Sequence, residues 1–339
     1  MGFKEDFMGN APGACPFLHL VERSTSDVLE QAEALPFWSQ DYTQLSKGAF
    51  SGSVTSVSCD GLQIFTETMN QAVDQIASAP VDSYVMGLPT LVDGESTWGL
   101  LPITTNSLIT LEKNAELYFK TSNISEITAA VIPAQRLETY AAEVEWIDLS
   151  KVMEGLKPVE MLHPDIAQQL LSALQGGIQY KADIADNIHA HQMWRNFEDD
   201  LLSTCLHTLL HVRGNIHPHF DQRLPRYLVN RVRDYTLSNS ALPLTIGELC
   251  KSLRVSRRTL NHAFIRVLGI TPVAYIRNLR LHRVRFEMQQ SPHEVISIAH
   301  LATKWGFWHL SLFSRYYREL FGECPIDTLQ RARLESKRP

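Results

Sequence analysis

Three side chains near the start of one predicted helix carry hydrogen-bonding groups that can read base edges in DNA. They are Arg258, Asn261 and His262, which lie on the polar face of that helix. In the major groove, arginine pairs with O6 and N7 of guanine, and asparagine pairs with N6 and N7 of adenine. We therefore predict base contacts from these three residues. On the same helix, Arg257 and Arg266 are predicted to contact phosphates.

The segment around these residues has the pattern of a helix-turn-helix unit. Thr245 is a typical N-cap for a first helix over 246–253, and Ser256 for a second helix over about 257–268. Gly269 is a typical residue for the end of the second helix. Apolar residues at spacings near four give the two helices a shared inner face: Leu249, Leu253, Leu260, Phe264 and Leu268. In such a unit the first helix supports the second, which enters the major groove.

A second unit of the same kind follows about fifty residues later. Its supporting helix is predicted over 295–305 and its recognition helix over about 308–321, which Gly322 ends. Trp308 is expected to pack at the start of this helix. Because the outward face has fewer specific donors than that of the first unit, we expect it mainly to position the protein on the DNA backbone. The residues predicted to make these contacts are His309, Ser311, Ser314, Arg315 and Arg318.

A basic helix predicted over 272–288 joins the two units. Sixteen residues of helix span roughly 24 Å. With its flanking turns, this helix could hold the two recognition helices near the ~34 Å of one duplex turn, so that both reach successive major grooves on one face. Its arginines are spread around the helix: Arg277, Arg280, Arg283 and Arg285.

Charge is divided unequally along the chain, although the net charge is only −6. Residues 223–339 contain 20 Lys and Arg against 8 Asp and Glu, whereas residues 1–222 contain 11 against 29. A basic domain gains affinity for a duplex by releasing condensed counterions. The acidic part should be repelled by the same duplex and is expected to point away from it. We therefore predict an effector-sensing domain over 1–222 and a DNA-binding domain over 223–339.

The pattern of residues 223–333 resembles that of the AraC/XylS family of transcription regulators. The similarity covers both recognition helices and the turns that follow them. The residues that carry it are Ser256, Leu260, Phe264, Gly269, Pro272, Ala299, Ala302, Gly306, Phe307, Phe313, Ser314, Arg315, Phe321, Gly322 and Pro325. The sequence departs from the family pattern at His309, Tyr317 and Cys324, and none of these changes threatens the fold.

The resemblance implies a cytoplasmic transcription activator that binds an operator or promoter duplex, works with RNA polymerase and carries an N-terminal effector domain. Within the family, segments 255–260 and 305–310 are similar to those of regulators of ethanolamine utilisation operons. That similarity implies ethanolamine and adenosylcobalamin as effectors. A regulator that answers to a different small metabolite, or a DNA-binding protein without effector control, remains an alternative.

Residues 49–133 alternate short apolar runs with turn residues such as Asp60-Gly61 and Asp93-Gly94. This spacing is typical of a small β-barrel or sandwich, and we predict a cupin-like domain. One interruption, Glu67–Ala79, is predicted to be a helix. With the all-helical C-terminal domain, the fold class is α+β. The predicted strands are 52–57, 62–66, 83–88, 107–111 and 127–132.

Two amphipathic helices are predicted after the strands, over 164–176 and 197–212. Leu206 and Leu209 belong to the apolar stripe of the second. Such a stripe either covers the sheet or forms the seam of a homodimer, and the sequence leaves both interpretations open.

An effector pocket would need apolar and aromatic walls. Aromatic residues of the N-terminal part are the candidates, although side chains of this type more often belong to an ordinary core: Trp38, Tyr42, Phe50, Phe65, Tyr84 and Trp98.

The sequence contains no recognisable catalytic constellation. No histidine lies between His19 and His163, so the strand region lacks the ligands of a cupin-type metal centre. A nucleophile elbow, a P-loop and a GxGxxG motif are also absent. His207 and His211 lie one helical turn apart and could form a metal pair, but no third ligand follows at a recognised spacing. We predict neither an enzyme nor a metal protein.

The cysteines and the hydropathy indicate the compartment. The five cysteines show no close pairing, which favours free thiols in a reducing cytoplasm. Cys205 and Cys250 are predicted to be small core residues. No apolar run reaches the length of about 18 residues that a membrane-spanning helix needs, and the charged segment 1–7 does not resemble a secretory signal.

Overall fold

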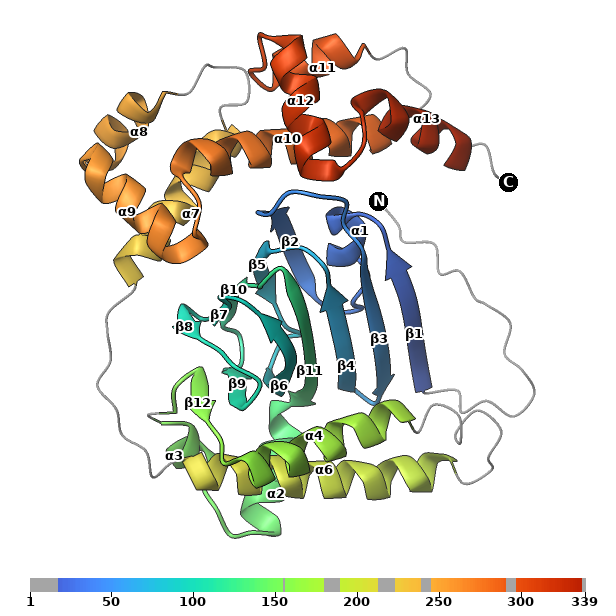
Figure 1. Ribbon diagram of the computed structural model, residues 1–339. Helices are drawn as coiled ribbons and strands as arrows, with labels where there is room; N and C mark the ends of the chain where they lie inside the picture. The colour runs from blue at the N-terminus through green and yellow to red at the C-terminus, as the bar shows by residue number, and fades with distance from the viewer. Residues whose placement is uncertain are drawn as a thin grey trace.

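The computed structural model of the protein has a sheet-rich N-terminal domain and a helical C-terminal domain that lies against it (Figure 1). We call the N-terminal part, residues 18–212, the sandwich domain. The structure describes residues 18–154, 156–179, 190–212, 223–238, 245–290 and 297–336.

Two antiparallel sheets form the sandwich domain. The larger sheet contains, in spatial order, β1 (Leu18–Thr25), β3 (Gly52–Cys59), β4 (Leu62–Met69), β11 (Ile124–Pro133), β6 (Ser83–Asp93), β9 (Ser107–Leu111) and β12 (Val159–Met161). The smaller sheet contains β2 (Ser39–Gln44), β5 (Val73–Ser78), β10 (Glu116–Lys120), β7 (Thr97–Trp98) and β8 (Leu101–Pro102).

The predicted strands are confirmed, and all five lie in the larger sheet. Asp60 and Gly61 connect β3 to β4 with φ angles of 49° and 86°. A two-residue hairpin turn with both φ angles positive favours Asp-Gly, as the sequence indicated. The two sheets confirm a sandwich, while the cupin-like assignment stays a prediction.

The helix predicted over Glu67–Ala79 is wrong. The first residues complete β4, and Val73–Ser78 form β5. Strand β5 pairs with β2 on one side and with β10 on the other. Because strand formation depends on such neighbours more than on local propensity, a segment with helical spacing can become the centre of a sheet.

The core of the sandwich lies between the two sheets. It combines side chains of the larger sheet with side chains of the smaller one: Val54, Phe65, Val131, Ala77, Trp98 and Phe119. Two short helices accompany the sheets, α1 (Val28–Ala32) and α3 (Leu149–Met153).

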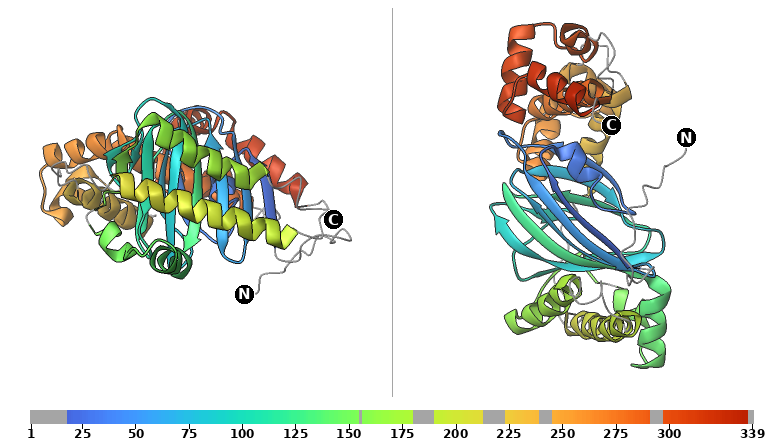
Figure 2. Two further views of the ribbon diagram at one scale, coloured as in Figure 1. Left: turned by 90° about the horizontal axis from the view of Figure 1, so that it is seen from below. Right: turned by 90° about the vertical axis from the view of Figure 1, so that its right-hand side faces the viewer.

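Three helices cover the outer face of the larger sheet: α2 (Ala134–Glu143), α4 (Pro164–Gln179) and α6 (Ala190–Val212). In Figure 2, α4 and α6 run side by side across the strands. Leu206 and Leu209 are buried in the same cluster as Leu62 and Ile64 of the sheet. The apolar stripe of α6 is therefore an intramolecular cover, and these two leucines are not available as a dimer seam.

In the described parts of residues 223–336, the C-terminal domain contains seven helices: α7 (Arg223–Ser238), α8 (Ile246–Leu253), α9 (Arg257–Leu268), α10 (Pro272–Gln290), α11 (Ile298–Lys304), α12 (Leu310–Phe321) and α13 (Pro325–Glu335). Helices α8 to α12 agree with the predicted helices to within a few residues. Residues 291–296, where the supporting helix of the second unit was predicted to begin, lie outside the described residues.

Four of the five cysteines belong to the described residues, and all four are free thiols. Cys205 is fully buried, and its burial raises the pKa of the thiol to about 12. Cys250 is only partly buried. Among the helices in the described part of the chain, none combines the length and apolar character that crossing a membrane requires.

Candidate nucleic-acid interface

Helices α8 and α9 form the first helix-turn-helix unit. The hydroxyl of Thr245 accepts the backbone N–H of Glu248 at 3.2 Å, and the Glu248 carboxylate accepts the N–H of Thr245 at 2.9 Å. This capping box fixes the start of α8. Arg254 ends α8 with a φ of 54°, and the hydroxyl of Ser256 then accepts the N–H of Thr259 at 3.0 Å to start α9.

Helix α9 presents its polar face to solvent. Leu260 and Phe264 are fully buried on the opposite face, in a core shared with α7 and α8. The five residues predicted to contact DNA are all exposed: Arg257, Arg258, Asn261, His262 and Arg266. The helix can therefore bring these donors to a duplex without any change in its packing.

Helices α11 and α12 form the second unit, with Gly306 in the turn between them. Gly306 has a φ of 80°, and a Cβ at this position would lie 2.8 Å from Nη1 of Arg280. The positive φ therefore favours glycine, and a Cβ here would also have to displace the end of the Arg280 side chain. The five predicted contact residues of this unit are also exposed: His309, Ser311, Ser314, Arg315 and Arg318.

The prediction that Trp308 packs at the start of the second recognition helix is wrong. Helix α12 begins at Leu310, with His309 as its N-cap, and the side chain of Trp308 is 60% exposed. The neighbouring Phe307 packs there instead, with its ring 5.2 Å from that of Phe313. The sequence could not show which of two adjacent aromatic residues would face the core.

Helix α10 connects the two units rigidly. Its first half, including Tyr275 and Leu279, is buried in the core of the first unit. Its second half, including Leu281, Val284 and Met288, is buried in the core of the second. Nineteen residues of continuous helix span about 28 Å. Because each end is part of a core, the separation of the recognition helices is set by the length of α10.

Known proteins are similar in sequence to this part of the chain. Residues 249–331 match the family model of a helix-turn-helix domain. The XylDLEGF operon transcriptional activator of Pseudomonas putida is 34% identical over 105 residues, which make up 31% of this chain and 33% of the activator. The chain therefore carries a helix-turn-helix domain that is similar in sequence to part of this transcription activator. The matched relatives are transcription regulators and not enzymes.

Two solved structures are similar to different extents of the chain. A probable AraC family transcriptional regulator from Rhodopseudomonas palustris CGA009 is 34% identical and covers 32% of this chain and 98% of its own, with a TM-score of 0.30. The AraC-like transcriptional activator CuxR is 17% identical and covers 84% of this chain and 99% of its own, with a TM-score of 0.40. The chain spans about a third of the length of the first curated relatives.

The C-terminal domain packs directly on the sandwich domain through ion pairs. Arg226 of α7 donates to Asp74 of β5 at 2.8 Å, and both side chains are buried. Arg233, also on α7, pairs with Asp41 of β2. Lys47 extends the contact on the surface by pairing with Glu319 of α12 at 2.7 Å. Part of the positive charge that the sequence assigned to DNA is therefore neutralised within the protein.

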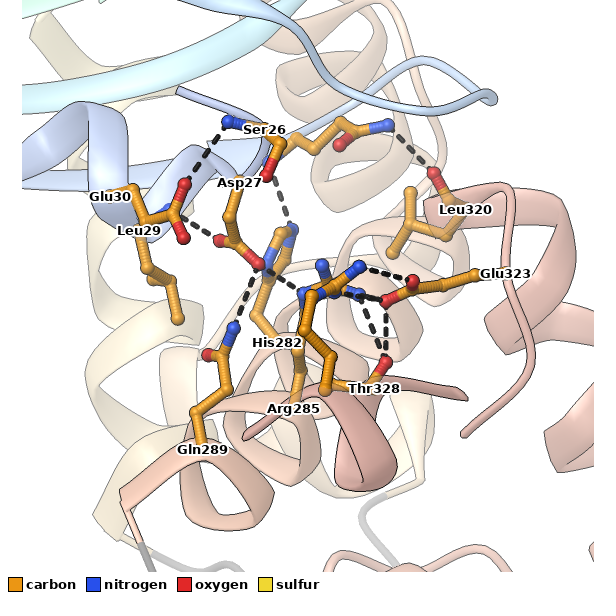
Figure 3. Close-up of polar contacts among 12 residues, drawn as sticks. Ser26, Asp27, Leu29, Glu30, His282, Arg285, Gln289, Leu320, Glu323 and Thr328 are labelled. Carbon is orange, nitrogen blue, oxygen red and sulfur yellow. Dashed lines mark hydrogen bonds and ion pairs between the residues drawn. The ribbon is translucent and has the colours of Figure 1, made fainter. Parts of the chain in front are cut away.

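Arg285 of α10 is the centre of a buried polar cluster between the domains (Figure 3). Its guanidinium pairs with Asp27, the N-cap of α1, and Nη1 donates to Glu323 at 2.6 Å. The Asp27 carboxylate also accepts from Gln289 at 3.1 Å and from the N–H of Leu29 at 2.7 Å. Burial acts to raise the pKa of Asp27, but Arg285 and the N–H of Leu29 outweigh it and keep that pKa below its ordinary value. We call this cluster the Asp27–Arg285 latch.

Gln44, at the end of β2, contacts both α10 and α12 beside the latch. Its backbone N–H donates to Nε2 of His282 at 3.0 Å, and its side-chain amide donates to the carbonyl oxygen of Leu320 at 2.7 Å. Burial lowers the pKa of His282 to about 4, so the ring is a neutral acceptor at neutral pH. One strand end of the sandwich domain therefore holds the linking helix and the second recognition helix together.

Glu67 of β4 lies buried close to α1. Its Oε1 accepts from Gln31 at 2.9 Å and from the hydroxyl of Tyr42 at 3.1 Å. Burial raises the pKa of Glu67 to about 7, against these hydrogen bonds, which lower it. The carboxyl group is thus placed where small changes of pH alter its charge.

The six aromatic residues proposed to line an effector pocket do not come together. Trp38, Phe65 and Trp98 belong to the core between the sheets, whereas Tyr42 and Phe50 pack with α1. Tyr84 joins the helix-covered outer face of the larger sheet. The sequence could not separate them, because all six types suit either a pocket or a core. As a group they are core residues, and a shared effector site is not supported.

The histidine pair predicted on α6 lies at the surface. Nδ1 of His211 and the carbonyl oxygen of His207 are 2.9 Å apart, which is within hydrogen-bonding distance. Within the described ranges, no three His, Cys, Asp or Glu side chains come close enough together to hold a metal ion. Four further histidines lie near this pair in the sequence. His189, His217 and His219 are outside the described residues, as is the side chain of His191.

Proposed function

We propose that this protein is a transcription activator that binds a specific DNA duplex with both helix-turn-helix units and responds to a small molecule through its sandwich domain. The observation that carries the proposal is the rigid pairing of two exposed recognition helices by α10. A single helical hairpin would fit many roles, whereas two units at a fixed separation fit successive major grooves. RNA polymerase and a second copy of the chain are further partners in this proposal.

The test of DNA binding is a selection from random duplexes with the purified full chain. We expect enrichment of a sequence with two conserved segments about one helical turn apart, from centre to centre. The enriched duplex should then bind on the order of a thousandfold more tightly than a scrambled duplex of the same composition, at one fixed salt concentration. Equal affinity for both duplexes would reduce the protein to a nonspecific DNA binder.

For the effector, we propose ethanolamine together with adenosylcobalamin, on the basis of the sequence resemblance. The latch and Gln44 support effector control in general, because they connect the sandwich domain to α10 and α12. A ligand that favours one arrangement of this contact would shift the DNA-binding state.

Calorimetric titration of the full chain tests whether ethanolamine and adenosylcobalamin are its effectors. Ethanolamine and adenosylcobalamin are added separately and together, and the same mixtures are used in DNA binding. Heat of binding with a changed DNA affinity would support the assignment. No binding by protein that still binds its selected duplex would exclude these two ligands, and a screen of other small metabolites would then test effector control itself.

A further inference from the structure

The start of α12 is apolar and exposed, in contrast to the start of α9. Trp308, Leu310 and Leu312 are 60%, 44% and 39% exposed. At the equivalent end of α9 the exposed side chains include Arg257 and Arg258. The two recognition helices therefore present different chemistry at the end that enters a groove.

The position of these side chains is the one that meets base edges. In a helix-turn-helix unit the N-terminal residues of the recognition helix contact the bases. Leu310 is the first residue of α12, and Trp308 directly precedes its N-cap. Leu312 lies three residues before Arg315, and residues at this spacing are neighbours on a helix surface. The apolar group therefore continues into the basic face of the helix.

The core does not require these three residues. Phe313 and Tyr317 already fill the inner face of α12. Single exposed apolar residues are common on protein surfaces. Here three large ones lie within five consecutive residues, at the end of the helix that enters a groove, which indicates a contact with another molecule there. Leu310 and Leu312 lie on different sides of the helix, because residues two apart do not face each other.

We propose that Trp308, Leu310 and Leu312 recognise the 5-methyl groups of thymines in the major groove. This inference rests on the proposed function and adds the sequence preference of the second unit. The thymine methyl is the apolar group on the major-groove edge of the base pairs, and apolar side chains are its natural contacts. Arg315 and Arg318, exposed on the same helix, supply the positive charge that holds such a surface against the phosphates.

The two units would then recognise different bases. The first unit reads guanine and adenine through hydrogen bonds from Arg258 and Asn261. The second reads thymine through apolar contact. This replaces the expectation from the sequence that the second unit serves mainly to position the protein on the backbone.

The test uses the duplex that the full chain selects from random DNA. Each thymine in that duplex is replaced in turn by deoxyuridine, which removes the methyl group and leaves base pairing unchanged. We expect one or more positions at which deoxyuridine weakens binding of the natural protein by about fourfold, the effect of one buried carbon. At those positions Trp308→Ala or Leu312→Ala should bind thymine and deoxyuridine duplexes alike.

The matched control is Trp146→Ala, since Trp146 is 90% exposed but belongs to the sandwich domain. This variant should keep the full thymine preference. Circular dichroism melts confirm that each variant is folded. If no thymine position responds to deoxyuridine, or if Trp308→Ala and Leu312→Ala weaken both duplexes equally, the methyl-reading surface is refuted and the patch is a site for another protein. A chain that selects no sequence at all would instead overturn the proposed function.

Discussion

Arg258 and Arg315 lie at exposed positions on the two recognition helices, and their predicted roles differ. We expect Arg258→Ala to weaken binding to the selected duplex by roughly 1–3 kcal/mol and to relax the preference at one base pair, because a bidentate contact to guanine is lost. Affinities for the selected duplex and its single-base variants measure both the loss of binding free energy and the relaxed base preference. A loss of the same size on scrambled DNA would make Arg258 a phosphate contact.

Arg315→Ala should weaken binding to all duplexes alike and flatten the dependence of affinity on salt, since a phosphate contact releases counterions without reading sequence. Titrations at several salt concentrations, on selected and scrambled duplexes, give both quantities. Lys151→Ala, at an exposed site of the sandwich domain, is the control and should change neither. A base-specific loss in Arg315→Ala would contradict the assignment.

Glu67 gives the stability of the sandwich domain a pH dependence. Its pKa rises from an ordinary 4.5 to about 7 on folding, so the folded protein keeps a proton that the unfolded chain releases. The contribution of the protonated Glu67 to the unfolding free energy is fully present below pH 4.5, and it is lost as the pH rises through 7. Glu67→Gln lacks this loss, and above pH 7 it should gain up to roughly 3 kcal/mol relative to the natural protein.

Urea unfolding of Glu67→Gln and the natural protein at pH 5, 6, 7 and 8 checks this. The difference in unfolding free energy should grow with pH. Ser39→Ala is the control, since Ser39 is exposed and has no titratable side chain, and its difference from the natural protein should stay constant. Parallel pH profiles for Glu67→Gln and the natural protein would show that the carboxyl group is already charged in the fold.

At the scale of elements, the sequence predicts those helix bounds that depend on neighbouring residues. The helices of the first unit begin at capping residues, Thr245 and Ser256, and both recognition helices end at glycines, Gly269 and Gly322, so these bounds follow from a few adjacent residues. Strand β5 was missed because its partners β2 and β10 are distant in the sequence. The exposure of Trp308 was missed because Phe307 beside it is an equal candidate for the same space.

The latch joins two elements that are distant in the sequence, since Asp27 and Arg285 are 258 residues apart. No local sequence pattern could predict this contact. We expect Arg285→Met to lower the unfolding free energy by roughly 3–5 kcal/mol, since it leaves the Asp27 carboxylate buried without its cation. The double variant Asp27→Asn with Arg285→Met should recover part of that loss. Urea unfolding of the natural protein and the three variants forms a double-mutant cycle.

Lys47→Ala with Glu319→Ala provides a comparison for that cycle, since this pair spans the same two domains at the surface. An exposed pair should show a coupling energy of less than about 1 kcal/mol. Additive effects at Asp27 and Arg285 would mean that the latch does not couple the domains.

At the scale of the whole molecule, charge and pattern indicated a basic DNA-binding domain attached to an acidic one, and the helical domain has the expected two units. The arrangement of the domains could not be predicted. The acidic residues that face α7 and α10 come from three separate strands and turns, so only the folded chain assembles Asp27, Asp41 and Asp74 opposite the arginines. The six aromatic effector candidates lie in three separate clusters. Residue type could not show this distribution either, because it depends on tertiary structure.

The rigid separation of the two units is the central claim of this account. Its most direct test is the affinity of the full chain for its selected duplex after five base pairs, half a helical turn, are inserted between the segments read by the two units. Because both ends of α10 are buried in cores, the second recognition helix cannot follow its groove to the opposite face of the duplex. We predict that the affinity falls at least about a hundredfold, close to that of a duplex with one segment scrambled. Unchanged affinity would contradict the account, since it would show that the two units bind independently or that one of them does not bind.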